Sequence, residues 1–229
     1  MIATGDLDHF RVHRYSQTNE ESVLRNVFDL LPSSVRGYLV DVGAGDGASL
    51  SNTQLFLEEG WQGCRFDYRF SSPAHGLYQH MITRENIVAL LDQYRVPEEV
   101  GLLSIDIDGV DLYVLDAMLR PKRLSPAVIV FEINARRQPA GFDVIRYASD
   151  FIGRPGDYFG ASWSAYRHVL AQHGYTVVHH SRSLNGYAVR KALDIEPFEG
   201  LPPMSFGHAH DPTGVWLDAR DVFSLGEGT

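Results

Sequence analysis

The stretch that most constrains this chain is VDVGAGDG, Val40–Gly47, in which three glycines fall within five positions directly after an apolar run. The run GYLVDV, residues 37–42, is short, apolar and bounded by turn residues, which is typical of a buried strand. Glycine adopts backbone angles that other residues avoid, and it leaves no side chain between the backbone and a ligand. A bare loop at this place predicts a strand–loop–helix unit that binds a nucleoside cofactor.

Strand-like and helix-like segments alternate along the chain. Apolar runs at 64–67, 77–82, 101–107 and 127–133 predict strands, and helical spacing appears at 19–31, 51–60, 84–94, 110–119 and 162–173. This alternation predicts right-handed crossovers and a mostly parallel sheet with helices on both faces. The end differs, because YTVVHH, a turn at Asn185–Gly186 and GYAVR predict an antiparallel hairpin at the sheet edge.

Composition limits the classes of partner. The 229 residues favour one domain, residues 1–229, and the formal charge of −9 argues against a nucleic-acid or anionic membrane surface. Cys64 is the one cysteine, so no intramolecular disulfide can form, and neither a signal peptide nor an apolar run of ~20 residues is present. We therefore expect a soluble, cytoplasmic protein that acts on a small molecule; a homodimer is left open.

The glycine spacing separates two cofactors. A dinucleotide-binding loop has the pattern G-x-G-x-x-G, whereas this loop reads G-x-G-x-G after an acid, Asp41. A carboxylate at Asp41 would repel a pyrophosphate but would favour the cationic methionine end of S-adenosylmethionine. Asp67, at the end of the second predicted strand, can accept hydrogen bonds from the ribose of either cofactor. The loop therefore favours S-adenosylmethionine over NAD.

Several blocks, taken in order, resemble those of FkbM-type class I methyltransferases: SQTNEE, DVGAGDGASLSNT, GWQGCRFD, ITRENI, LLSIDIDGVDLYVLDAM, VIVFEIN and YFGASWSAYRHVLAQHGY with NGYAVR. The resemblance covers residues 15–192 and implies a Rossmann-like α/β fold and O-methylation of a small metabolite, sugar or natural-product intermediate. It also implies cofactor contacts by Asp41, the loop glycines (Gly43, Gly45, Gly47), Asp67 and Gln17 in the N-terminal lid block, although a helix cap or a solvent contact would also explain Gln17. Asn52 and Thr53, early in the helix after the loop, could contact the cofactor, and helix capping explains them equally well. Residues 135–157 and the tail after Leu193 match none of these blocks; we expect residues 135–160 to form an acceptor-side insertion and the tail from about 197 to be irregular.

A second acidic cluster follows the later strands. SIDIDGVD places Asp106, Asp108 and Asp111 at the end of one strand, and FEIN places Glu132 and Asn134 at the end of the next. Acids that converge at one edge of a sheet repel each other unless a proton or a cation relieves them. By analogy with metal-dependent O-methyltransferases, Asp106, Glu132 and Asn134 would bind Mg²⁺ or a similar ion, and Asp106 and Asp108 would be catalytic. Turn formation, helix capping or cofactor contact by these acids would explain them equally well.

Other candidates and functions carry less support. His208 and His210 have a metal-like spacing in a Gly/Pro-rich tail. Arg136, Arg137 and Arg146 could bind an anionic acceptor. His80 is more simply a packed imidazole than a base. An NAD-dependent oxidoreductase is disfavoured because the one Tyr-x-x-x-Lys spacing, Tyr187 with Lys191, falls on a predicted strand. An inactive cofactor-fold binding module remains the non-enzymatic alternative.

Overall fold

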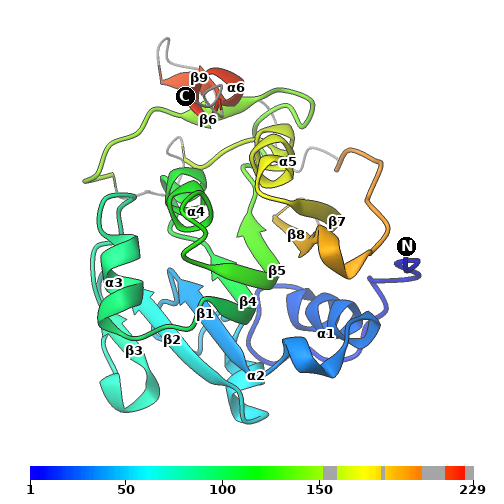
Figure 1. The fold of residues 1–229 in the computed structure, drawn as a ribbon, viewed down its shortest axis with the longest axis vertical. Coiled ribbons are helices and arrows are strands. Elements are labelled where there is room, and N and C mark those ends of the chain that lie inside the picture. Colours follow the sequence, from blue (N-terminus) through cyan, green and yellow to red (C-terminus); the bar gives the residue numbers. More distant parts are fainter. Residues whose placement is uncertain (152–158, 182–183, 203–214, 225–229) are drawn as a thin grey trace.

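A seven-stranded mixed sheet forms the centre of the protein, seen in a computed structural model that describes residues 1–151, 159–181, 184–202 and 215–224 (Figure 1). The spatial order of the strands is β3-β2-β1-β4-β5-β8-β7. Neighbours from β3 to β5 run parallel, and β8 is antiparallel to both β5 and β7. Their bounds are Tyr38–Val42 (β1), Gln62–Asp67 (β2), Leu77–Gln79 (β3), Glu99–Ile105 (β4), Ser125–Glu132 (β5), Tyr175–Ser181 (β7) and Asn185–Arg190 (β8). The predicted methyltransferase-type Rossmann-like fold, with its antiparallel hairpin at the C-terminal edge, is confirmed.

Helices cover both faces of this sheet. On one face, α1 (Glu20–Leu30) and α2 (Gln54–Glu58) share a buried apolar cluster with alternate residues of the strands, such as Leu39 and Leu102. On the other face, α3 (Ile87–Gln93), α4 (Asp111–Leu119) and α5 (Trp163–Gln172) pack over residues such as Leu103. Three short 3-10 turns lie at Ser33–Val35, Pro73–His75 and Lys191–Leu193. Because both faces are covered, the inner strands are apolar along most of their length, as parallel strands usually are.

The segment after β5 and the tail form a small second sheet. Strand β6 (Asp143–Ile145) pairs antiparallel with β9 (Trp216–Asp218), which leads into α6 (Ala219–Val222) next to α5 (Figure 1). Val144 also bridges to Ala161, so the segment is tied to the start of α5. The tail thus contains regular elements that its composition did not predict, while His208 and His210 lie outside the described residues.

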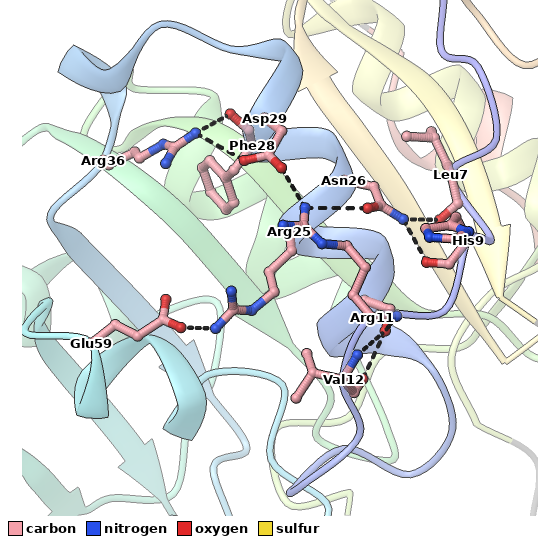
Figure 2. Close-up of polar contacts among 11 residues, drawn as sticks. Leu7, His9, Arg11, Val12, Arg25, Asn26, Phe28, Asp29, Arg36 and Glu59 are labelled. Atoms are coloured by element: carbon pink, nitrogen blue, oxygen red, sulfur yellow. Dashed lines mark hydrogen bonds and ion pairs between the residues drawn. The ribbon is translucent and has the colours of Figure 1, made fainter.

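The N-terminal segment lies along α1 (Figure 2). The Asn26 side-chain amide donates to the carbonyls of Leu7 and His9, both at 2.9 Å, and Arg11 pairs with Asp29. Ser22 accepts from two further backbone N–H groups of this segment. These bonds satisfy backbone groups of residues 7–12, which belong to no strand in the described part of the chain. Arg25 pairs with Glu59 and so connects α1 to the end of α2 (Figure 2).

No helix in the described ranges is both long and apolar enough to cross a lipid bilayer.

Candidate functional site

A cavity of about 280 Å³ opens at the carboxyl ends of β1, β2 and β4. The strand order reverses between β1 and β4, and ligands of open parallel sheets bind outside such a switch point. The lining residues come from the carboxyl ends of β1, β2 and β4, from the loops after β1, β2, β3 and β4, and from Phe151: Asp41, Gly43, Ala44, Gly45, Ser49, Leu50, Ser51, Asn52, Phe66, Asp67, Tyr68, Arg69, His80, Met81, Ile82, Ser104, Asp106, Ile107, Asp108 and Phe151. The loops that the sequence singled out after β1, β2 and β4 therefore meet at one cavity.

The three loop glycines have three different surroundings. A Cβ on Gly43 would lie 1.6 Å from the carbonyl oxygen of Asp106, so only glycine lets the loops after β1 and β4 touch. A Cβ on Gly45 would meet nothing within 4 Å, so the bare backbone here faces open space in the cavity. Gly47 does not line this cavity; its missing side chain makes room for the guanidinium of Arg65. Gly43 and Gly45 both line the cavity, and of these two only Gly45 has open space at its Cβ position.

Asp67 joins two of the loops that line the cavity. Its Oδ2 accepts a hydrogen bond from the backbone N–H of Gly45 at 3.0 Å. Its Oδ1 accepts from the N–H groups of Arg69 at 2.7 Å and Phe70 at 3.0 Å. The carboxylate therefore fixes the glycine loop relative to the loop after β2, and it also lines the cavity, where its remaining lone pairs can accept from a ligand.

Asp41 lies at the inner end of the cavity and is almost fully buried. Burial raises its pKa to about 6. The hydrogen bond that Thr53 Oγ1 donates to it at 2.6 Å and the nearby positive charge of Arg65 lower the pKa and so limit this rise. Asp41 therefore carries a mostly ionised carboxylate at neutral pH and makes the inner end of the cavity negative. Thr53, predicted to contact the cofactor, is fully buried and binds Asp41, whereas Asn52 lines the cavity.

Three carboxylates meet at the ends of β4 and β5. Asp106, Asp111 and Glu132 each offer an oxygen within 4.8 Å of the others. The fully buried Asp111 accepts from the N–H groups of Ile107 at 2.7 Å and Gly109 at 3.0 Å, at the start of α4. Asp108 lies at the exposed turn between them, with a φ of 52°. Of this group, Asp106 and Asp108 line the cavity.

Proximity and burial change the protonation of this group. Burial, and then the charges of Asp111 and Asp108, raise the pKa of Asp106 to about 7. Burial and the charge of Asp106 raise the pKa of Glu132 well above its usual value. A hydrogen bond between the two side chains lowers the pKa of Asp106 and raises that of Glu132. These acids repel one another when they are ionised, and a proton or a cation would relieve that repulsion.

Asn134, a predicted metal ligand, has other partners. Its amide nitrogen donates to the carbonyl of Phe159 at 2.7 Å, and its amide oxygen accepts from the N–H of Arg136 at 2.9 Å. The side chain thus holds the segment after β5 against the start of α5. Asp111 lies with Asp106 and Glu132, although the sequence did not predict it as a metal ligand.

Other predicted residues lie away from the cavity. Gln17 is exposed and is not among the lining residues. Arg137 pairs with Asp143 at 2.9 Å and stacks on the ring of Trp216, so it holds the small β6–β9 sheet together. Arg136 and Arg146 belong to the same segment, and neither lines the cavity.

The sequence did not single out the apolar wall of the cavity. Phe66, Ile82 and Ile107 line it, together with His80, whose Nε2 lies 2.8 Å from the hydroxyl of Tyr94. Exposed Leu50 lines the cavity with a positive φ of 56°, an unusual backbone angle for a leucine. His80 directly follows β3 and Phe66 is the last residue but one of β2, so position at a strand end is the signal for these two residues. Ile82, Ile107 and Leu50 lie further along the loops.

Comparison with known proteins adds little beyond the fold. No family model matches the sequence, and no curated protein matches it. Among solved structures, human N-acetylserotonin methyltransferase in complex with S-adenosylmethionine is 14% identical with a TM-score of 0.38, over 76% of this chain and 56% of that one. A methyltransferase from Aquifex aeolicus is 13% identical (TM-score 0.40; 73% and 89% of the two chains). An O-methyltransferase family protein from Burkholderia thailandensis is 13% identical (TM-score 0.40; 82% and 59%). The chain thus spans little more than half the length of two of these proteins, and its fold is identified by strand order and direction.

Proposed function

We propose that this protein is an S-adenosylmethionine-dependent methyltransferase of the FkbM type that methylates an oxygen of a small molecule. One observation carries the proposal. The open backbone at Gly45 and the carboxylates of Asp67 and Asp106 line a single cavity at the switch point of a methyltransferase-type sheet.

The charge of the cavity favours a cationic donor. Its described lining includes four aspartates, Asp41, Asp67, Asp106 and Asp108, against one arginine, Arg69. A pyrophosphate in this cavity would meet carboxylates on several sides, whereas a sulfonium would be attracted to them. The same argument disfavours NAD and agrees with the glycine spacing.

The parts of the donor match different parts of the lining. The apolar wall of Phe66, Ile82 and Ile107 suits an adenine ring, and Asp67 suits the ribose hydroxyls. The open backbone at Gly45 and the carboxylate of Asp41 suit the methionine end. The methyl group would then point toward the loop after β4, where Asp106 and Asp108 lie.

Asp106 is the proposed general base. A base is most effective when its pKa lies near the working pH, and burial has moved that of Asp106 to about 7. Bound S-adenosylmethionine would supply the methyl group: the acceptor oxygen would bond to the methyl carbon as the carbon–sulfur bond breaks, and S-adenosylhomocysteine would leave. The hydroxyl proton passes to the carboxylate of Asp106. Alignment of oxygen, carbon and sulfur supplies the rest of the rate, an effect of up to ~7–11 kcal/mol.

The three-carboxylate group also fits a hard divalent cation. Glu132 Oε2 is buried and has no hydrogen-bond partner in the described part of the chain, and a cation would relieve the mutual repulsion of the acids. We propose Asp106, Asp111 and Glu132 as the residues that would hold it; Asp106 would then bind the ion, and its role as the base applies to the protein without the ion. Such an ion would lower the pKa of the acceptor hydroxyl and orient it.

Calorimetric titration tests the proposal. We expect S-adenosylmethionine and S-adenosylhomocysteine to bind with roughly micromolar dissociation constants, and NAD to give no heat. Repeating the titration with Mg²⁺ and with EDTA tests the cation. Binding of NAD in place of the two sulfur compounds would refute the methyl donor. An untargeted metabolite screen with labelled donor would then identify the acceptor and exclude an inactive binding module.

A further inference from the structure

Arg65 is a buried arginine within a strand of a parallel sheet, directly behind the glycine loop. It sits in the middle of β2 with 4% of its surface exposed, beside its register partner Asp41 in β1. A charge in such a place is costly unless hydrogen bonds and opposite charge compensate it. The cavity does not reach Arg65, so direct contact with the donor does not explain it.

The guanidinium of Arg65 joins three separate segments. Nη1 donates to the carbonyl of Gly47 at 2.7 Å and to Oε1 of Gln54, the first residue of α2, at 3.1 Å. Nη2 donates to the carbonyl of His75, in the turn before β3, at 2.9 Å. The planar fork of arginine can serve three acceptors in fixed directions, which the single ammonium of lysine cannot.

Two features favour glycine at the third position of the loop, Gly47: its φ of 85° and this contact with Arg65. A Cβ on Gly47 would lie 2.8 Å from Nη1 of Arg65, and the guanidinium cannot easily move because its hydrogen bonds hold it. Gly47 therefore permits a close approach between the loop and Arg65, not between the loop and the donor. Asp67 fixes the middle of the same loop through Gly45, so the loop is held at two points by side chains of one strand.

We propose that Arg65 is a positioning residue, which holds the glycine loop in the shape that binds the methyl donor. This inference rests on the proposed function, because it assumes that the loop binds S-adenosylmethionine. Arg65 acts through the backbone of Gly47 and not by touching the donor. Its loss should therefore weaken donor binding by more than the general loss of stability explains.

The test compares Arg65→Met with Arg123→Met. Arg123 is a matched control, since it also donates to a backbone carbonyl, that of Val96 at 2.9 Å, and to the side chain of Asp92. It precedes β5 and so lies at the opposite end of the strands from the cavity. Calorimetry with S-adenosylhomocysteine is run well below the melting temperature of each variant. We expect Arg65→Met to weaken binding about tenfold or more, the scale of one charge-assisted hydrogen bond, and Arg123→Met to change it less than about twofold.

Two further variants keep the test decisive if Arg65→Met does not fold. Arg65→Lys retains the charge but not the fork, and Gln54→Met removes one acceptor; both should weaken binding by less than Arg65→Met. In a double-mutant cycle, Gly47→Ala should weaken binding less in the Arg65→Lys protein than in the wild type, because the clash with Nη1 is removed. The inference would be overturned if Arg65→Met and Arg123→Met weakened donor binding equally. It would also be overturned if the effects of Gly47→Ala and Arg65→Lys on donor binding were simply additive. A wild-type protein that binds no donor would instead overturn the proposed function.

Discussion

The hydrogen bond between Thr53 and Asp41 offers a test of how the inner end of the cavity is charged. Thr53→Val removes the hydroxyl that donates to Asp41 at 2.6 Å and leaves a side chain of nearly the same shape. Both residues are buried, so water cannot easily replace the lost donor. A hydrogen bond to a charged group is worth about 1.5–3 kcal/mol, and one between neutral groups about 0.5–1.5 kcal/mol.

The effect of Thr53→Val should depend on pH. The folded-state pKa of Asp41 is raised to about 6. The contribution of Asp41 to the free energy of unfolding is therefore fully present at low pH and is lost as the pH rises through 6. The hydroxyl limits that loss because it stabilises the charged form. At pH 5 Asp41 is protonated and we expect Thr53→Val to lower the free energy of unfolding by about 1 kcal/mol. At pH 8.5 Asp41 is ionised and the loss should reach about 2–3 kcal/mol.

Urea denaturation at the two pH values measures this difference. For a chain of this size, each 1 kcal/mol corresponds to about 2–4 °C in melting temperature, so thermal melts provide a second readout. Thr83→Val is the control. The Thr83 hydroxyl accepts from the backbone N–H of Asn86 at 3.2 Å and also bonds Glu85, whose pKa of about 2 keeps it ionised at both pH values, so the effect of losing the hydroxyl should not depend on pH. Asp106 and Glu132 are present in every variant, so their titration cancels. If Thr53→Val destabilises the protein equally at pH 5 and pH 8.5, then Asp41 is not the buried, titrating carboxylate described above.

Three further expectations concern the cavity itself. Gly43→Ala should abolish donor binding and lower the melting temperature by several degrees, because its Cβ would overlap the carbonyl of Asp106 and its φ of 95° is strained for alanine. Calorimetry measures the donor binding and circular dichroism measures the melting temperature; near-wild-type values of both would contradict the contact. Asp67→Ala should weaken S-adenosylhomocysteine binding more than about tenfold, since both the Gly45 anchor and the ribose acceptor are lost; unchanged affinity would remove Asp67 from the site. Asp106→Asn should leave donor affinity within about threefold while stopping methyl transfer in the labelled-donor assay, and a large loss of donor binding would reassign it from base to donor contact.

Local pattern was enough to predict most elements of the fold. Apolar runs predicted β1, β4 and β5, and helical spacing predicted α1, α4 and α5, because burial on one face or two leaves a short-range period in the sequence. The Ser162 side chain caps α5 by accepting from the N–H of Ala165 at 3.3 Å, close to the predicted start of that helix. The helix after the glycine loop was placed too early, since α2 begins only at Gln54 and the preceding residues form the cavity rim and the contacts to Asp41.

The sequence by itself determined the order along the chain of the strands and helices that build the main sheet, and with it the edge of the sheet where a site must lie. Only the tertiary structure decided which side chains use that edge. Asp111 lies with Asp106 and Glu132, Asn134 bonds the backbone of Phe159 and Arg136, β6 pairs with β9 across more than seventy residues of chain, and Gly47 contacts Arg65. The physical reason is range: periodicity records whether a residue is buried, whereas the partner of a buried polar group depends on which distant segments the closed sheet brings to it.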